Sequence, residues 1–320
     1  MFEDQFKRAQ LTQRVNSGKG LCIATDPCVL LLEKLTEWLC DGALGGIVYG
    51  VSRQGKTMAT KWVLKNIHKV IGSVPSAHVP IRGGEQLTDQ KFFSYLLQSV
   101  KHRHQSGNAG DKRTRLCNFL CDRAIRSGSY TFILFLDEAQ KMLPLHYAWL
   151  QNLGNEMEKR DVRLFLLQVG QPELVHVETK LLDAGLVELP LRYTENLLEF
   201  PGITSHESLR ECLEGFDSVE SPPGIKFYSN YDAAHISLSD HSKKIWQCFE
   251  LISDNFGAAD CEIPMRAITR FVTKILNALA KQKLERCVVS DELIQSSVIE
   301  TRFEYWLKLR SSGVAETEEC

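Results

Sequence analysis

One run of residues constrains this chain more than any other part of its sequence. Residues 50 to 57 read Gly-Val-Ser-Arg-Gln-Gly-Lys-Thr, which fits the pattern G-x-x-x-x-G-K-[ST] in full. The short apolar segment 46 to 50 predicts a strand before the glycine-bearing turn, and a helix is expected to start near Lys56. One buried face of that helix is expected to be formed by Val63, Ile67, Val70 and Ile71.

The residue types in this turn suit a nucleotide. Glycines let successive backbone N–H groups face phosphates, and the start of the helix adds the positive end of its dipole. Lys56 is expected to reach the β- and γ-phosphates of ATP, and the Thr57 hydroxyl to ligate Mg²⁺. A plain glycine turn is the alternative, which the flanking strand and helix disfavour. The expected binding residues are Gly50, Val51, Ser52, Arg53, Gln54, Gly55, Lys56 and Thr57.

A pair of acidic residues ends the apolar run Phe132-Ile-Leu-Phe-Leu-Asp-Glu. A carboxylate at the end of a buried strand is costly unless positive charge compensates it, and a metal ion is the natural compensator. Asp137 is therefore expected to hold Mg²⁺ through its water shell, and Glu138 to polarise the water that attacks the γ-phosphate. The alternative is that the two residues only cap the following helix.

A third polar group follows the next apolar run, in Gln168-Val-Gly-Gln-Pro-Glu-Leu. An amide at the end of a strand that neighbours the metal strand can orient the attacking water or touch the γ-phosphate. Gln171 is the better candidate for this role, ahead of Gln168. A plain turn before Pro172 is the alternative.

Further apolar runs predict a parallel sheet. Residues 77 to 81, 130 to 136 and 163 to 170 are strand candidates, and the last two lack alternation, as expected for strands covered on both faces. Pro80 places the first of them at a sheet edge or a strand end. Because helical stretches separate the strands, we expect an α/β fold with a parallel sheet sandwiched by helices.

The sequence pattern changes after residue 196. Residues 1 to 40 are expected to form an N-terminal lead-in segment that includes a helix, and residues 41 to 196 the nucleotide-binding core. Residues 197 to 310 are expected to supply a connecting segment and a helical lid. The small, polar and acidic residues 311 to 320 are expected to be a disordered tail.

Composition excludes several other classes. The ten cysteines are scattered and the nine histidines are dispersed, so neither a disulfide framework nor structural zinc is expected. A net charge of −2 confines any nucleic-acid contact to a local patch. No apolar run is long enough to span a bilayer and the opening residues are too polar for a secretory signal, so no membrane partner and a cytoplasmic location are expected.

Taken together, the motifs resemble those of the AAA+ ATPases that regulate Tn7-like transposition, called TnsC or TniB, with the ExeA-type ATPases as related proteins. The resemblance covers roughly residues 40 to 300 and implies the AAA+ P-loop NTPase fold with a C-terminal helical lid. The motifs that carry it are residues 50 to 57, Leu136-Asp-Glu-Ala-Gln-Lys, Val169-Gly-Gln-Pro-Glu-Leu, Phe200-Pro-Gly-Ile-Thr-Ser and Pro264-Met-Arg-Ala-Ile-Thr-Arg.

The resemblance implies an ATP-hydrolysing adaptor and its partners. Members of this family assemble as rings or helical filaments around double-stranded DNA, so a homo-oligomer is implied. A target selector of the TniQ or TnsD type and a transposase of the TnsB or TniA type are the implied protein partners. The alternative is an ExeA-like ATPase that acts on a secretion complex or another protein complex without DNA; a nucleotide-binding scaffold that does not hydrolyse ATP is a further alternative.

The resemblance also points to two arginines. Arg192, in Leu-Pro-Leu-Arg-Tyr, matches the position of an arginine finger that completes the site of a neighbouring subunit. Arg266 is similar to the lid-helix arginine that contacts the γ-phosphate, and Arg270, one turn later, is its rival. For each of them, an exposed helix arginine or a local salt bridge is the alternative.

A local basic patch is the candidate DNA contact. It lies in a loop and helix start that would face the pore of a ring, and phosphate contacts of this kind give affinity without sequence reading. A solvated charged surface is the alternative. The residues of the patch are Lys101, Arg103, Lys112, Arg113 and Arg115.

Overall fold

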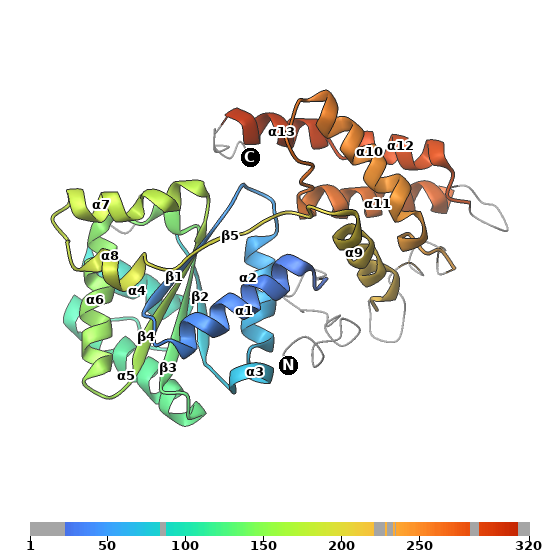
Figure 1. The fold of residues 1–320 in the computed structure, drawn as a ribbon. Coiled ribbons are helices and arrows are strands. Elements are labelled where there is room, and N and C mark those ends of the chain that lie inside the picture. Colours follow the sequence, from blue (N-terminus) through green and yellow to red (C-terminus); the bar gives the residue numbers. More distant parts are fainter. Residues whose placement is uncertain are drawn as a thin grey trace. The chain divides into compact units, whose positions relative to one another are not determined.

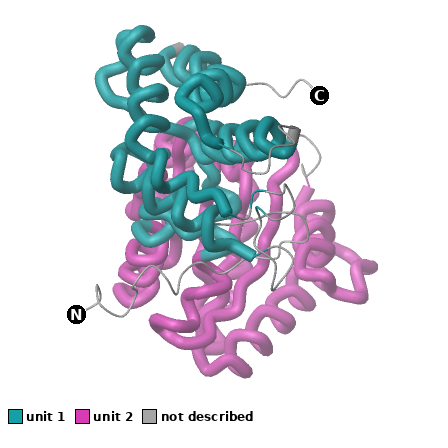
Figure 2. Tube along the Cα trace, turned by 90° about the vertical axis from the view of Figure 1, so that its right-hand side faces the viewer, with its two compact units in different colours: residues 1–30, 51–62, 201–320 teal, residues 31–50, 63–200 magenta. Residues whose placement is uncertain are grey.

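The computed structural model describes residues 23–83, 88–220, 228, 233, 235–281 and 288–312. They fall into two compact units (Figure 2): unit 1 takes in the described residues of 1–30, 51–62 and 201–320, and unit 2 those of 31–50 and 63–200. The helices are α1 (Asp26–Cys40), α2 (Lys56–Asn66), α3 (His68–Ile71), α4 (Asp89–Ser99), α5 (Ala109–Ser127), α6 (Pro144–Glu158), α7 (Val177–Asp183), α8 (Leu189–Tyr193), α9 (His206–Ser218), α10 (Ser242–Asn255), α11 (Met265–Lys281), α12 (Asp291–Ile299) and α13 (Phe303–Ser312), with 3-10 turns η2 (Ala139–Lys141), η3 (Pro172–His176) and η5 (Ser239–His241).

A parallel sheet forms the centre of unit 2. Within the described residues it has five strands in the order β2-β3-β4-β1-β5. Because all of them run the same way, their carboxyl ends meet at one edge, where Tyr49 pairs with Gly170 and Asp137 pairs with Val169. The strands are β1 (Gly45–Tyr49), β2 (Ser76–Pro80), β3 (Thr131–Asp137), β4 (Arg163–Gly170) and β5 (Leu197–Glu199).

Helices lie on both sides of this sheet (Figure 1). The face that carries Ile47, Leu134 and Leu166 is buried in a cluster with apolar side chains of α4, α5 and α6. On the opposite face α1 comes so close to β1 that a Cβ at Gly46 would overlap with the ring of Trp38. Every residue of β3 is buried, which explains why the sequence of that strand lacks alternation.

Unit 1 contains a separate apolar core. Helices α9 to α13 contribute to it, and the rings of Phe249 and Phe303 meet edge to face with their centroids 5.2 Å apart. An antiparallel bridge joins Ile203 to Ile263 just before α11. The described residues of the C-terminal half are therefore mostly helical, as the sequence predicts.

The first helix after the glycine turn differs from the expectation. A single helix was predicted to bury Val63, Ile67, Val70 and Ile71 on one face, but α2 ends at Asn66 and the short α3 follows. Val63 and Ile67 are buried, whereas Val70 and Ile71 are half-buried. Ile67, which lies between the two helices, keeps a right-handed helical backbone with a φ of −56°, and the helical path ends at Gly72, whose φ is 85°.

Two features lie near the expected segment limits. Strand β5 pairs with β1 just past residue 196, and the sequence did not predict it because three residues are too few to show a period. Helix α13 continues to Ser312, and the rest of the expected disordered tail, residues 313–320, lies outside the described residues. Among the described helices, none combines the length and the hydropathy that crossing a lipid bilayer requires.

Candidate nucleotide site

The glycine turn has the backbone that its sequence predicts. Strand β1 ends at Tyr49, and α2 begins at Lys56. Within the turn Arg53 has a φ of 73° and Gly55 a φ of 101°, so the chain enters the left-handed region twice before the helix starts. Lys56 is 8% exposed, and its Nζ donates a hydrogen bond of 2.8 Å to the Val51 carbonyl oxygen.

The start of α11 packs against this turn in unit 1. The backbone N–H of Arg266 donates to the carbonyl oxygen of Arg53 at 3.3 Å, and a Cβ on Gly55 would lie 3.3 Å from the Cβ of Met265. Arg270, one turn further along, donates instead to the Thr301 carbonyl oxygen at 3.2 Å. Of the two lid arginines, Arg266 is therefore the one whose backbone is joined to the phosphate-binding turn.

A buried carboxylate also holds the turn, and sequence reasoning missed it. Glu262 is 7% exposed, and its Oε1 accepts from Gln54 Nε2 at 2.7 Å and from the Gly202 N–H at 2.5 Å. Its Oε2 lies 2.8 Å from a guanidinium nitrogen of Arg310 on α13. Helix α13 has a second contact with the turn, because Trp306 Nε1 donates to the Ser52 carbonyl oxygen at 3.2 Å.

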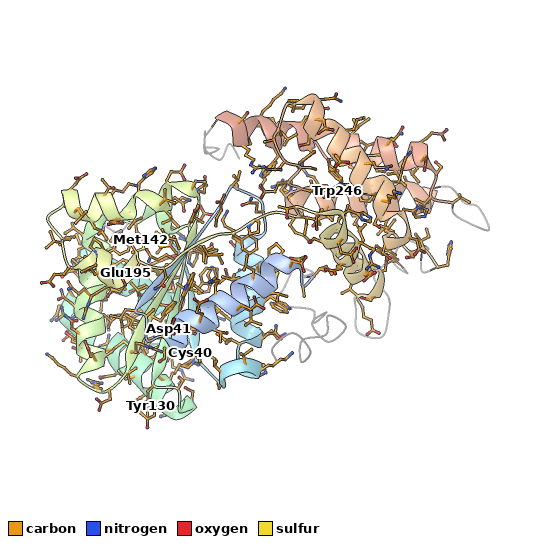
Figure 3. The ribbon with its side chains drawn as sticks, viewed as in Figure 1. Cys40, Asp41, Tyr130, Met142, Glu195 and Trp246 are labelled. Atoms are coloured by element: carbon orange, nitrogen blue, oxygen red, sulfur yellow. The ribbon has the colours of Figure 1, made fainter. Side chains whose placement is uncertain are left out.

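The acidic pair lies in unit 2, at the edge of the sheet where the strands end. Figure 3 shows the direction of β3: Tyr130 lies just before the strand, and Met142 lies beyond its carboxyl end. Asp137, the last residue of β3, is 7% exposed. Its Oδ2 lies 3.0 Å from Nε2 of His78 on β2, whose ring stacks on Phe135 with centroids 4.5 Å apart.

His78 is a second residue that sequence reasoning missed. It was expected only as part of a strand, but its ring orients the carboxylate that is predicted to hold Mg²⁺. The parallel pairing of β2 with β3 places His78 opposite Phe135 and Pro80 opposite Asp137. A signal was available in the polar residue within an otherwise apolar strand, but its partner could be identified only from the strand order.

Glu138 has a distinctive backbone and a defined partner. Its φ of 58° is in the left-handed region, which bends the chain sharply as β3 ends. Its Oε2 accepts a hydrogen bond of 2.8 Å from Gln140 Nε2, and Lys141 Nζ lies 3.5 Å away. Gln140 in turn accepts from the backbone N–H of Gln171 through Oε1, at 3.2 Å.

The two glutamines of β4 and its following turn have different environments. Gln168 is fully buried, accepts from the Tyr147 hydroxyl at 2.7 Å and donates to the Tyr193 carbonyl oxygen at 2.7 Å. Burial raises the pKa of Tyr147, so its hydroxyl remains a proton donor at neutral pH. Gln168 thus serves the packing of β4, whereas Gln171 is half-buried just past the end of the strand, beside the partner of Glu138.

Arg192 lies on α8, away from the edge of the sheet where the strands have their carboxyl ends. Its guanidinium donates to Asn155 Oδ1 at 2.8 Å and lies 3.8 Å from Glu158 Oε2, both on α6. The next residue, Tyr193, packs against the first residue of β1, since a Cβ on Gly45 would lie 2.9 Å from its Cα. Four residues of strand, about 13 Å, separate this end of β1 from the end that enters the glycine turn.

The five residues of the basic patch do not share one environment. Lys112 is 7% exposed, and its Nζ donates to Ser94 Oγ at 3.3 Å. Arg113 pairs with Glu156 at 2.8 Å, and Arg115 donates to the Ser106 carbonyl oxygen at 2.8 Å. Lys101 and Arg103 are exposed in the loop between α4 and α5.

The residues predicted to hold a magnesium nucleotide are of the right chemistry. Thr57 offers a hydroxyl and Asp137 a carboxylate, the hard oxygen ligands that Mg²⁺ prefers. Asp137 is buried at a strand end, where a bound cation offsets the cost of its charge. Lys56 and Thr57 belong to unit 1, whereas Asp137 and Glu138 belong to unit 2.

Within the described residues, the five-stranded parallel sheet with helices on both sides has the fold of AAA+ P-loop NTPases. Residues 40–177 match the family model described as AAA domain. This match and the similar solved structures described below support nucleotide hydrolysis as a general activity. No curated protein matches this chain.

Solved structures give the same fold. The chain is similar to the ORC2 protein of Aeropyrum pernix, solved as ADPNP and ADP complexes, with 14% identity over 92% of this chain and 72% of that chain and a TM-score of 0.57. It is also similar to the ORC1 protein of the same organism, solved in complex with DNA, with 17% identity over 92% of this chain and 69% of that chain and a TM-score of 0.50.

Proposed function

We propose that this protein is an ATP-dependent, DNA-binding regulator of transposition, which assembles on duplex DNA and links a target selector of the TniQ or TnsD type to a transposase of the TnsB or TniA type. The observation that carries the ATPase part is the alignment of the strand ends in unit 2. Strand β1, which leads directly into the glycine turn, pairs with β4, and β4 pairs with β3, which ends at Asp137. The transposition role rests on the resemblance of the motifs.

In this proposal each residue of the site has one task. Lys56 binds the β- and γ-phosphates, and Arg266 contacts the γ-phosphate from the start of α11. Thr57 and Asp137 hold Mg²⁺, which supplies charge neutralisation to the phosphates when bound. Glu138 accepts the proton of the attacking water.

Gln171 completes the site from the end of β4, where its amide orients the same water. The bond between its backbone N–H and Gln140 keeps the turn after β4 next to Glu138. Gln168, fully buried and bonded on both sides of its amide, takes no part.

Arg192 is proposed to act in the site of a neighbouring subunit. The next residue, Tyr193, lies beside the first residue of β1, and this favours the role because the glycine turn of the same subunit follows the other end of that strand. Assembly then becomes a condition for hydrolysis, since each site is completed by the next subunit. Cleavage of the γ-phosphate removes the group that Arg192 of one subunit and Lys56 of the next both contact, and so weakens the contact between the two subunits.

DNA is proposed as the partner around which the subunits assemble. The crystallised ORC1 relative was solved with DNA, which favours this choice over a protein complex without DNA. Lys101 and Arg103 are the patch residues with exposed side chains, so they are the first candidates for phosphate contacts, ahead of Lys112, Arg113 and Arg115. Such contacts weaken as salt concentration rises.

The substitution Glu138→Gln tests the proposal. We expect it to preserve ATP binding and assembly on plasmid DNA but to reduce turnover by about 10²- to 10⁴-fold, because the general base is lost. Turnover is measured by phosphate release, and assembly by sedimentation and negative-stain imaging at two salt concentrations. The exposed Glu178→Gln on α7 is the matched control and should keep wild-type turnover.

The outcomes distinguish the parts of the proposal. Normal turnover by the Glu138→Gln variant would remove that residue from its role. ATP-dependent assembly that is indifferent to DNA would favour the alternative of a protein partner, such as a secretion complex. Assembly on DNA without any effect on a transposase would be consistent with the ATPase part of the proposal but would contradict the transposition role.

A further inference from the structure

The amide of Gln140 connects two residues of the proposed site. Its Nε2 donates to Glu138 Oε2 at 2.8 Å, and its Oε1 accepts from the backbone N–H of Gln171 at 3.2 Å. Glu138 follows β3 and Gln171 follows β4, so one half-buried side chain joins the polar ends of two adjacent strands. An amide suits this place because its NH₂ group donates while its separate carbonyl oxygen accepts.

The last residue of β4 is shaped around this amide. A Cβ at Gly170 would overlap with Gln140 Oε1, and it would also press on the side chain of Leu174. A side chain at that position would therefore have to displace the tips of Gln140 and Leu174, whereas the backbone itself sets no such limit, since the φ of Gly170 is not positive. Gly170 also pairs with Tyr49, the strand residue that leads into the glycine turn.

We infer that Gln140 is a positioning residue for hydrolysis: it fixes the carboxylate of Glu138 and couples it to the turn that carries Gln171. This inference rests on the proposed ATPase function and assigns a task to a residue that does not touch ATP. The left-handed backbone of Glu138 leaves its side chain without the support of a regular helix, so a side-chain bond has to set its direction. A general base displaced by about 1 Å loses much of its effect.

Three substitutions separate the two bonds of the amide. Gln140→Ala removes both bonds. Gln140→Glu keeps an acceptor for the Gln171 N–H but cannot donate to Glu138 and places a like charge beside it. Gln140→Asn keeps the amide group on a side chain that is one methylene shorter, and so tests whether the length of the side chain matters.

We expect Gln140→Ala and Gln140→Glu to lower kcat by about 10- to 100-fold, while the KM for ATP and the Kd for an ATP analogue stay within about twofold of wild type. Gln140→Asn is expected to be intermediate. The matched control is Gln151→Ala, which removes an amide on α6 whose Nε2 donates to Glu188 at 3.4 Å on an exposed surface. It should leave kcat unchanged.

A double-mutant cycle decides whether Gln140 acts through Glu138. Single-turnover hydrolysis is measured for Gln140→Ala, Glu138→Gln and the combination. If Gln140 works by positioning Glu138, adding Gln140→Ala to Glu138→Gln causes no further loss. Additive losses, or a kcat of Gln140→Ala equal to wild type, overturn the inference; a Glu138→Gln variant with normal turnover contradicts the proposed function instead.

Gly170→Ala provides an independent test from the other side of the bond. The added methyl group displaces Gln140 Oε1, so it should lower kcat by the same mechanism and give no further loss when combined with Gln140→Ala. The Kd for the ATP analogue verifies that each variant is folded. A Gly170→Ala variant with wild-type kcat also contradicts the inference.

Discussion

At the scale of single residues, the site depends on partners that hold the reactive groups in place. Asp137 and Glu138 are adjacent in sequence, yet each has its own support: His78 from β2 for the aspartate, and Gln140 for the glutamate. A ligand that is oriented by a second residue binds its metal more tightly than one that has to be ordered on binding. In the proposed metal site, His78 would thus orient a ligand without touching the metal.

This view predicts the result of changing His78 to Phe. The substitution keeps a ring to stack on Phe135 and removes the nitrogen that lies 3.0 Å from Asp137 Oδ2. We expect the Mg²⁺ concentration for half-maximal ATPase activity to rise about 10-fold, with little change in kcat at saturating Mg²⁺. A magnesium titration of turnover measures the effect, and an unchanged midpoint would show that His78 only packs.

The places of the two motifs in the fold could be predicted because their residue types form local patterns in the sequence. Lys56 follows a glycine at a helix start, and Asp137 ends an apolar run, so both stand out in one dimension. The partners could not be predicted, because Gln54 and Glu262 are 208 positions apart and His78 and Asp137 are 59 apart. Such contacts follow from strand order and helix packing, which leave no local pattern.

At the scale of elements, the phosphate-binding turn is held by the C-terminal helices of unit 1. Helix α11 contacts Arg53 and Gly55, and α13 reaches the turn through Trp306 and, by way of Glu262, through Arg310. The turn is therefore supported by elements that follow it by about two hundred residues in the chain. The sequence predicted a helix in the region of α11 but not its contact with the turn.

Removing the carboxylate at this junction should destabilise the turn. In Glu262→Ala, the buried Gln54 amide and the Gly202 N–H lose their acceptor, so we expect a loss of about 2 kcal/mol in the free energy of unfolding and weaker ATP binding. Denaturant unfolding and nucleotide titration measure both. Arg310→Met removes only the half-exposed partner and should cost less than about 1 kcal/mol.

The sheet shows where element prediction succeeds and fails. The unbroken apolar run of β3 and the proline that ends β2 at a sheet edge were read correctly from sequence. Strand β5 was missed because pairing with β1, and not its own three residues, makes it a strand. The break between α2 and α3 was missed because the apolar spacing continues through Ile67, whose backbone is still helical.

At the scale of the whole molecule, the proposed action of Arg192 in a neighbouring subunit would make activity a property of the assembly. Neither Arg192→Ala nor Lys56→Ala alone should hydrolyse ATP at more than a small fraction of the wild-type rate, since an arginine finger contributes about 10³- to 10⁵-fold. A mixture of the two should recover activity, because Lys56→Ala subunits supply intact arginines to Arg192→Ala subunits that bind ATP.

Phosphate release at several mixing ratios measures this recovery. The control is Arg126→Ala, which removes an exposed arginine from the last turn of α5 and should behave as wild type. Arg192→Ala protein with full activity by itself, or mixtures that show only the average of the two rates, would contradict action between subunits.

The bond between the Lys56 ammonium and the Val51 carbonyl has a consequence for how fast the protein can respond to its nucleotide. The Lys56 side chain already bonds to a carbonyl oxygen of the glycine turn. A phosphate that binds there would replace this carbonyl oxygen as the partner of the ammonium, so little of the chain would have to be ordered on binding. In the proposed cycle, nucleotide capture would then be governed by encounter and not by ordering of the turn, and the slow steps would be hydrolysis and the separation of subunits.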